Sequence, residues 1–419
     1  MNSDEKNLTE ELMGLKFPKP KLSMEKVCNT LNDIAETAKS VYKNSIDDID
    51  YLFGEARDCV EGCGANLDNA RLRLTHRGIQ YLTTTIEILS KNHLLPTEFI
   101  YYIYTLVAED IARDPKPKLF HFQNPYEAIW DKESPESPKL IEVDPEKYIP
   151  NPNNESWLFI HGMLYKGMNH DGTDIEQIDL NIYDFYGAFE AEAEMFKEGP
   201  NANIDIYLVS YDSEMNKTER EVMEKAIKGN VIASVEAFLF LLVAAVYWRE
   251  MKDRADKTGE YILPFLKRLK GNSGKVITHS LGCHVLAHAG QKIHHIDNMG
   301  ESFKEWWCMN AALPSDAFSN TGDFNRAPYI ADYYEDGKRT GTRVWYSLSD
   351  IVLMMIYPLA TYHTALGQTG AGISRQENFI EDIDLTNITD VYHGFEGEYI
   401  NRLGNCIRNF LHTETDKTC

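Results

Sequence analysis

From residue 156 onward, short apolar runs alternate with longer stretches in which apolar residues recur at helical spacing. The short runs are rich in β-branched and aromatic residues, which is typical of buried strands. They cover 156–160, 204–209, 275–278, 306–309 and 343–348. Helix-compatible sequence separates them, around 183–197, at 217–253 and after Ser280. Strands that alternate with helices predict a mostly parallel sheet covered on both faces, so we expect an α/β fold.

The N-terminal part of the chain follows a helical pattern instead. Val27, Leu31, Ile34, Ala38 and Val41 recur at steps of three and four residues, which places them on one face of a helix. Because of this spacing, we expect residues 1–113 to form an N-terminal helical region. Nothing in this region resembles a catalytic constellation, so it is expected to pack on the main body or to engage a partner.

Prolines and acidic residues dominate the stretch 114–155. Proline removes a backbone donor and fixes φ, so this stretch is predicted to be a connection with at most edge strands. The domain boundary is placed here, and residues 156–419 are assigned to the main, catalytic domain. The prolines are Pro115, Pro117, Pro125, Pro135, Pro138, Pro145, Pro150 and Pro152.

One strongly apolar segment, 231–248, approaches the length of a short membrane span. It contains Ser234 and Glu236, and charged helix-forming residues flank it on both sides. Its length and composition therefore favour a core helix over a membrane span. A hydrophobic cap over a lipid-binding cleft is the other interpretation.

Composition and charge favour a globular protein and argue against a nucleic-acid-binding one. The chain is 43% hydrophobic and 26% charged, which is ordinary for a soluble globular protein, and its formal net charge is −23. Such a charge repels nucleic-acid phosphates, so no nucleic-acid partner is expected, and any membrane contact would be peripheral. Acidic residues near residue 1 and seven cysteines without a CxxC pair favour a reduced, cytoplasmic protein. No metal ion or other cofactor is expected.

A serine between a strand and a helix is the most informative position in the sequence. The segment Thr278-His279-Ser280-Leu281-Gly282 matches the nucleophile-elbow pattern G-x-S-x-G, except that threonine replaces the first glycine. Small residues at these places relieve crowding around a sharply turned serine. The match alone leaves two interpretations open, a nucleophile or a helix N-cap serine.

Two backbone N–H groups are candidates for an oxyanion hole. Leu281 opens the helix after Ser280, where N–H groups lack helical partners. Met163 follows the strand 156–160 and the dipeptide His161-Gly162, whose glycine lets the backbone bend toward the cleft. We expect the N–H groups of Met163 and Leu281 to stabilise a developing oxyanion.

An activated serine also needs a base and an acid that orients this base. Asp350 follows the strand 343–348, and His393 lies in a loop after a short strand near 383–386. The chain order Ser280, Asp350, His393 suits this kind of sheet. The alternatives are His363 as the base, and Asp316, Asp384 or Asp390 as the acid.

Three further histidines lie close to Ser280 in the sequence. His279 is its direct neighbour and is expected to pack beside the turn. His284 and His288 are one helical turn apart, but no carboxylate stands at HExxH spacing. They are therefore interpreted as a packed or surface pair rather than as metal ligands.

These features together resemble the α/β-hydrolase superfamily. The segments FIHGM, THSLGCHVL, YSLSDIVL and DVYHGF follow one another in the expected order, and the resemblance covers 156–412. The part around and beyond Asp350 is similar to esterase/lipase-like branches of that superfamily. The resemblance implies the α/β-hydrolase fold, with Ser280 as nucleophile, His393 as general acid/base and Asp350 as its orienting acid.

The function expected is that of a serine hydrolase that cleaves carboxylic esters. The apolar stretches 231–248 and 351–360 favour an apolar acyl ester or a lipid as substrate. Thioester hydrolysis or acyl transfer would use the same residues. From a different class, a binding or scaffold protein of the same fold would use its N-terminal helices to engage a partner. A lipase effector that is secreted without a signal peptide is a third hypothesis.

Overall fold

The structure is a computed structural model. It describes residues 116–123, 139–163, 177–194, 203–213, 235–269, 274–296, 302–331, 333–335, 338–350, 352–361, 363–372, 380–389, 393, 398–412 and 419. The predicted N-terminal helical region, 1–113, lies outside these described residues.

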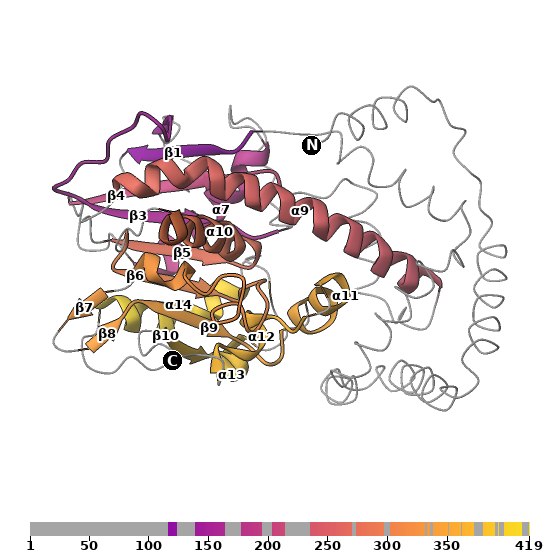
Figure 1. The fold of residues 1–419 in the computed structure, drawn as a ribbon. Coiled ribbons are helices and arrows are strands. Elements are labelled where there is room, and N and C mark those ends of the chain that lie inside the picture. The colour runs from indigo at the N-terminus through magenta and orange to yellow at the C-terminus, as the bar shows by residue number, and fades with distance from the viewer. Residues whose placement is uncertain are drawn as a thin grey trace, which may run out of the picture.

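An eight-stranded sheet forms the centre of the described structure (Figure 1). Its strand order is β10-β9-β6-β5-β3-β4-β1-β2. Six strands are parallel to one another: β3 (Glu155–Ile160), β4 (Ile204–Ser210), β5 (Lys275–His279), β6 (Glu305–Met309), β9 (Thr342–Tyr346) and β10 (Ile380–Asp384). The strands β1 (Lys118–Gln123) and β2 (Lys139–Glu142) complete the sheet in antiparallel pairing. The mixed α/β architecture expected from the sequence is present.

The sheet begins earlier in the chain than the proposed boundary. Both β1 and β2 fall within 114–155, the stretch predicted to be a connection, and only β2 lies at the edge. β1 pairs on both sides, and its residues Leu119 and Phe122 are buried in the core. The prolines that suggested a connection lie around these strands and not inside them. Proline density therefore marks where the strands stop rather than where the sheet domain stops.

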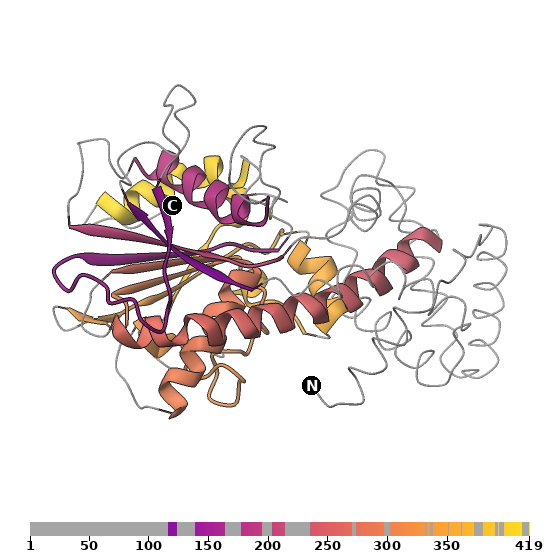
Figure 2. The same cartoon turned by 90° about the horizontal axis from the view of Figure 1, so that it is seen from above.

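Helices cover both faces of the sheet, as Figure 2 shows. α9 (Val235–Arg268) and α10 (Leu281–Ile296) pack together on one face, and α7 (Gln177–Ala193) and α14 (Glu398–His412) pack together on the other. The neighbours Trp306 and Trp307 are both fully buried and belong to the two different hydrophobic clusters. Successive side chains of a strand point to opposite faces, which explains why the parallel strands are apolar without interruption.

The helix α9 runs farther toward the C-terminus than the predicted range 217–253, and it ends at Arg268. The buried side of α9 continues through Ala255, Ile262 and Leu266 at helical spacing. The turns after residue 253 therefore pack on the same face of the sheet as the turns before it. Residues 217–234 lie outside the described part. None of the described helices has an apolar stretch long enough for a membrane crossing.

Shorter elements connect the last strands. Between β6 and β9 lie the 3-10 helix η1 (Ala327–Ala331) and a hairpin of β7 (Tyr333–Glu335) and β8 (Lys338–Thr340). Between β9 and β10 lie the π-helical turn η2 (Val352–Ile356), α11 (Tyr357–Thr361) and α12 (Leu366–Thr369), and α13 (Thr386–Thr389) follows β10. α11 packs against α9, where the rings of Trp248 and Tyr357 meet edge to face at 5.1 Å. The helices α11 and α12 lie on the side of the sheet at which the parallel strands end (Figure 1).

Candidate active site

Ser280 occupies a strained turn between β5 and α10. Its φ is +52°, a left-handed conformation that non-glycine residues adopt rarely. Its N–H donates to the carbonyl oxygen of Met309 at 3.0 Å, and its own carbonyl accepts from the N–H of Ala312 at 3.1 Å. The end of β6 therefore holds the turn in place. Strain of this kind persists only where the surroundings impose it, and it is concentrated at functional sites.

The flanking residues explain why the turn has this sequence. A Cβ on Gly282 would lie 2.5 Å from the carbonyl oxygens of Ile160 and His161, so only glycine fits there. At the first glycine position of the pattern, the hydroxyl of Thr278 accepts a hydrogen bond from the indole N–H of Trp306 at 2.8 Å. The same hydroxyl lies 3.1 Å from the sulfur of Cys283. Threonine is thus accommodated because its hydroxyl has buried partners.

The structure brings together the three residues predicted as a triad. Nε2 of His393 lies 2.8 Å from Oγ of Ser280, and Nδ1 of His393 lies 2.5 Å from Oδ2 of Asp350. These residues are 113 and 43 positions apart in the sequence, so the sheet and not local structure brings them together. Asp350 is fully buried, and its Oδ1 accepts the backbone N–H of Leu353 at 3.0 Å. The carboxylate is held from one side by backbone and from the other by the imidazole.

A second side chain also holds the carboxylate of Asp350. The amide of Asn310, directly after β6, donates to Oδ2 of Asp350 at 2.6 Å. The amide oxygen of Asn310 accepts from the hydroxyl of Tyr399 on α14 at 2.7 Å, and all three side chains are buried. Sequence reasoning did not identify Asn310 or Tyr399. The available signal was the place of Asn310 immediately after a buried strand, where functional groups gather in parallel sheets.

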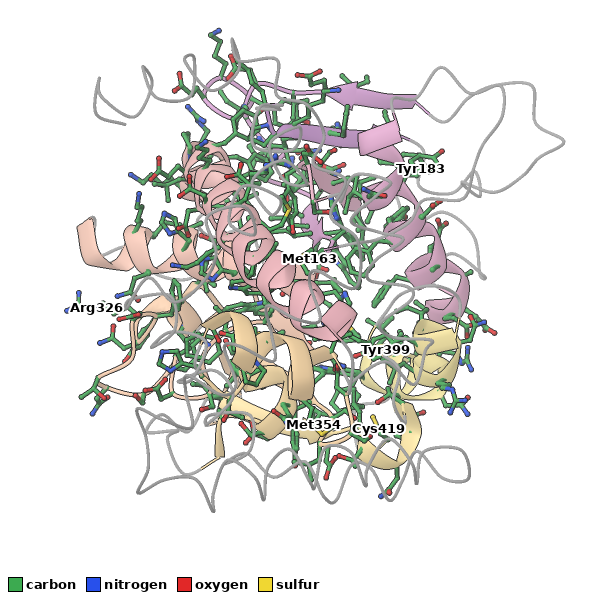
Figure 3. The ribbon with its side chains drawn as sticks, turned by 90° about the vertical axis from the view of Figure 1, so that its right-hand side faces the viewer. Met163, Tyr183, Arg326, Met354, Tyr399 and Cys419 are labelled. Carbon is green, nitrogen blue, oxygen red and sulfur yellow. The ribbon has the colours of Figure 1, made fainter. Side chains whose placement is uncertain are left out.

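The two predicted oxyanion donors flank the serine. Leu281 is the first residue of α10, and Met163 follows β3. Within the described residues, no acceptor takes the backbone N–H of either one. A Cβ on Gly162 would lie 2.8 Å from Cβ of Ser280, so the peptide that carries the Met163 N–H lies directly against the serine. In Figure 3, Met163 lies near the centre of the face at which the parallel strands end.

The other candidate base and acids lie elsewhere. His363 is exposed, and so are Asp316 and Asp384; Asp384 accepts the N–H of Thr386 at 2.9 Å at the start of α13. Asp390 lies outside the described residues. Among the described residues, it is His393 that contacts Ser280 and Asp350.

His279 packs beside the site, as expected from its position. Its ring centre lies 5.0 Å from that of His393 and 5.5 Å from that of Tyr399. Burial, together with the nearby imidazole of His393, holds the pKa of His279 well below its usual range. The ring is therefore neutral and packs against the imidazole of His393.

His284 and His288 join α10 to α9. Nε2 of His284 lies 2.8 Å and Nδ1 of His288 lies 2.9 Å from the same carboxylate oxygen of Asp256. The described residues hold no group of three or more histidine, cysteine or acidic side chains arranged for a metal ion. The pair is packed, and its contacts are between helices.

No family model and no curated protein matches this sequence. The geometry around Ser280 is therefore what bears on function.

Proposed function

We propose that this protein is a serine hydrolase of the α/β-hydrolase fold that cleaves carboxylic esters through an acyl-enzyme. The observation that carries the proposal is the hydrogen-bonded chain from Ser280 through His393 to the buried Asp350. A nucleophile within 3 Å of a base, and a base held by a buried acid, is the arrangement that nucleophilic acyl transfer needs.

The topology supports the fold proposed. The nucleophile follows β5, the acid follows β9 and the base follows β10, and all three strands belong to one parallel sheet. The first oxyanion donor follows β3, which is the neighbour of β5. A serine on a sharp strand-to-helix turn with this order of partners is the arrangement described for the nucleophile elbow.

The residues have separate tasks in the mechanism. Nε2 of His393 accepts the proton of Ser280 as its oxygen attacks the acyl carbon, and then gives that proton to the leaving alcohol. The N–H groups of Met163 and Leu281 stabilise the negative oxygen of each tetrahedral intermediate. Asp350 holds the imidazole with Nδ1 protonated and stabilises its positive form. Water activated by His393 then releases the acid from Ser280.

The proposed substrate is an ester whose acyl group is uncharged and apolar. Leu353 is buried beside Asp350, and the aromatic pair Trp248 and Tyr357 lies between the two helices next to this edge of the sheet. Thioesters would be cleaved by the same steps, and acyl transfer would differ only in the acceptor that replaces water.

Labelling with a fluorophosphonate tests the proposal. We expect one adduct, on the peptide that carries Ser280, which Ser280→Ala and His393→Ala both abolish. The matched control is Ser302→Ala. Ser302 is buried, and its hydroxyl donates to the carbonyl of Leu266 at 3.0 Å. It lies just before β6, at the starts of the parallel strands, whereas Ser280 lies at their ends. Ser302→Ala should label like the wild type. A wild type that is folded but takes no label, and hydrolyses no ester of an acyl chain-length series, would end the hydrolase proposal.

A further inference from the structure

The turn after β3 is anchored by residues that follow β4. The hydroxyl of Tyr211 donates to the carbonyl of His161 at 2.9 Å, and the rings of these two residues stack with centres 4.5 Å apart. The hydroxyl of Ser213 donates to the carbonyl of Gly162 at 3.0 Å. His161, Tyr211 and Ser213 are all buried. The chain segment that contains the oxyanion donor is therefore fixed from the side of β4.

The carbonyl oxygen of Gly162 accepts a second hydrogen bond. Nδ1 of His161 lies 2.9 Å from it, and a carbonyl cannot donate, so Nδ1 carries the proton. Burial lowers the pKa of His161 to about 4, which keeps the ring neutral at physiological pH. Two neutral donors, the Ser213 hydroxyl and the His161 ring, thus converge on one carbonyl.

This carbonyl belongs to the same peptide group as the N–H of Met163. Peptide groups are planar, and in the trans form the C=O and N–H bonds point in opposite directions. The described residues contain no cis peptide. Fixing the direction of the Gly162 carbonyl therefore also fixes the direction of the Met163 N–H, which points away from Ser213.

We propose that Ser213 is a positioning residue for the oxyanion hole, which acts by holding the Gly162–Met163 peptide so that the Met163 N–H faces the reacting oxygen. The proposal rests on the function proposed above. The space around Gly162 supports it, since a Cβ there would lie 2.8 Å from both Cβ of Ser280 and Nδ1 of His279. The Gly162–Met163 peptide lies between Ser280 on one side and the hydroxyl of Ser213 on the other. Without the Ser213 hydroxyl, the peptide can rotate and turn the Met163 N–H away from the reacting oxygen.

Ser213→Ala removes one of the two anchors while the His161 ring remains. Losing an oxyanion donor outright lowers kcat by about 10²–10³-fold, so we expect a partial loss of about 10–100-fold for the misdirected donor. The KM for p-nitrophenyl butyrate should change by less than about 3-fold, because the oxyanion develops only in the transition state. Phenylboronic acid, whose serine adduct carries an oxygen in the same hole, should bind more weakly by a factor similar to the loss in kcat.

Ser302→Ala is the control for a merely structural effect, since it deletes the same kind of buried hydroxyl-to-carbonyl bond at the starts of the parallel strands. It should lower the melting temperature about as much as Ser213→Ala and leave kcat unchanged. Ser213→Thr keeps the hydroxyl and should recover most of kcat. Ser213→Cys is closer than threonine to serine in volume but replaces the hydroxyl by a weakly donating thiol, so its kcat should lie between those of the wild type and Ser213→Ala. A Ser213→Ala enzyme with wild-type kcat and wild-type boronate affinity overturns the inference alone. A wild type without hydrolysis or labelling of Ser280 refutes the hydrolase function, and the inference with it.

Discussion

Asn310 shows how one residue links the carboxylate of Asp350 to the rest of the core. Its φ is +42°, a left-handed conformation that asparagine tolerates better than most residues. In this conformation its amide donates to Asp350 and its oxygen accepts from Tyr399. The orientation of the acid therefore depends on a buried chain of neutral groups that starts on α14. Such a chain is stabilising only when every member keeps its partner.

Tyr399→Phe tests this dependence. The change leaves the buried oxygen of Asn310 without the tyrosine donor, which should lower the free energy of unfolding by about 1–3 kcal/mol. Equilibrium unfolding in urea measures this difference. Tyr148→Phe is the matched control, because its hydroxyl lies 3.1 Å from Nδ1 of His121 in a half-buried place, and it should cost less. Equal losses in the two variants would contradict the idea that the chain to Asp350 is the more tightly coupled one.

At the scale of the elements, three charged side chains that are partly or fully buried join neighbouring strands at the ends opposite to Ser280. Glu305 at the start of β6 lies 3.1 Å from Nζ of Lys275 on β5 and contacts the guanidinium of Arg343 on β9. Burial alone would raise the pKa of Glu305, but Lys275, Arg343 and the indole N–H of Trp307 together lower it to about 2. The three central strands are thus locked in register by charges as well as by backbone bonds.

Glu305→Gln should be strongly destabilising, because it leaves the buried Arg343 and the partly buried Lys275 without their shared anion. Removing one partner of a buried ion pair typically costs roughly 3–5 kcal/mol. Glu381→Gln is the control, since Glu381 lies 2.9 Å from Nε of the same Arg343 but is about half exposed, and exposed pairs contribute less than about 1 kcal/mol. Urea unfolding at pH 7 compares the two.

The pH dependence of the Glu305 contribution has a defined sign. The folded pKa lies below the unfolded one, so the stabilisation is present above about pH 4.5 and is lost as the pH falls toward 2. The difference between the wild type and Glu305→Gln should therefore shrink over that range. A constant difference would contradict the lowered pKa.

How far the sequence predicts these elements depends on how local their signals are. Most of the parallel strands after 156 were predictable because each is a short apolar run, and Ser280 and Asp350 because each follows such a run closely. His393 was predictable from its place after a short strand near 383–386 and from the order of the three residues along the chain. β1 was not, because its pairing with β4 joins positions about ninety residues apart, such as Leu119 and Val209, and leaves no periodicity of its own. Asn310 and Ser213 are ordinary polar residues after strands, and only the assembled sheet gives them partners.

For the whole molecule, the negative net charge and the burial of single acids together determine how stability changes with pH. The net charge of −23 means that each further ionisation at high pH adds to self-repulsion. Glu190 on α7 is an acid of this kind, because burial raises its pKa to about 8. Since its folded pKa exceeds the unfolded one, its contribution to stability is fully present below about pH 4.5 and is lost as the pH rises through 8.

Glu190→Gln should remove this loss. We expect the melting temperature of the wild type to fall between pH 6 and pH 9, and that of the variant to fall less. Glu192→Gln, on the same helix but beside Arg408 at 3.6 Å, controls for the removal of one negative charge. Parallel curves for the wild type and Glu190→Gln would show that this carboxyl ionises alike in the folded and unfolded chains.

The long separation between Ser280 and His393 has a consequence for how the protein is made. His393 lies 113 residues after Ser280 in the sequence, beyond the edge strand β10 and the helix α13. A ribosome therefore finishes Ser280 and the residues of its turn well before the imidazole of His393 exists. Under the proposed mechanism, the serine of the growing chain stays unactivated until the last strand of the sheet has joined its neighbour and His393 has reached Ser280. Under that mechanism, hydrolysis would report on completed synthesis and folding rather than on the presence of Ser280.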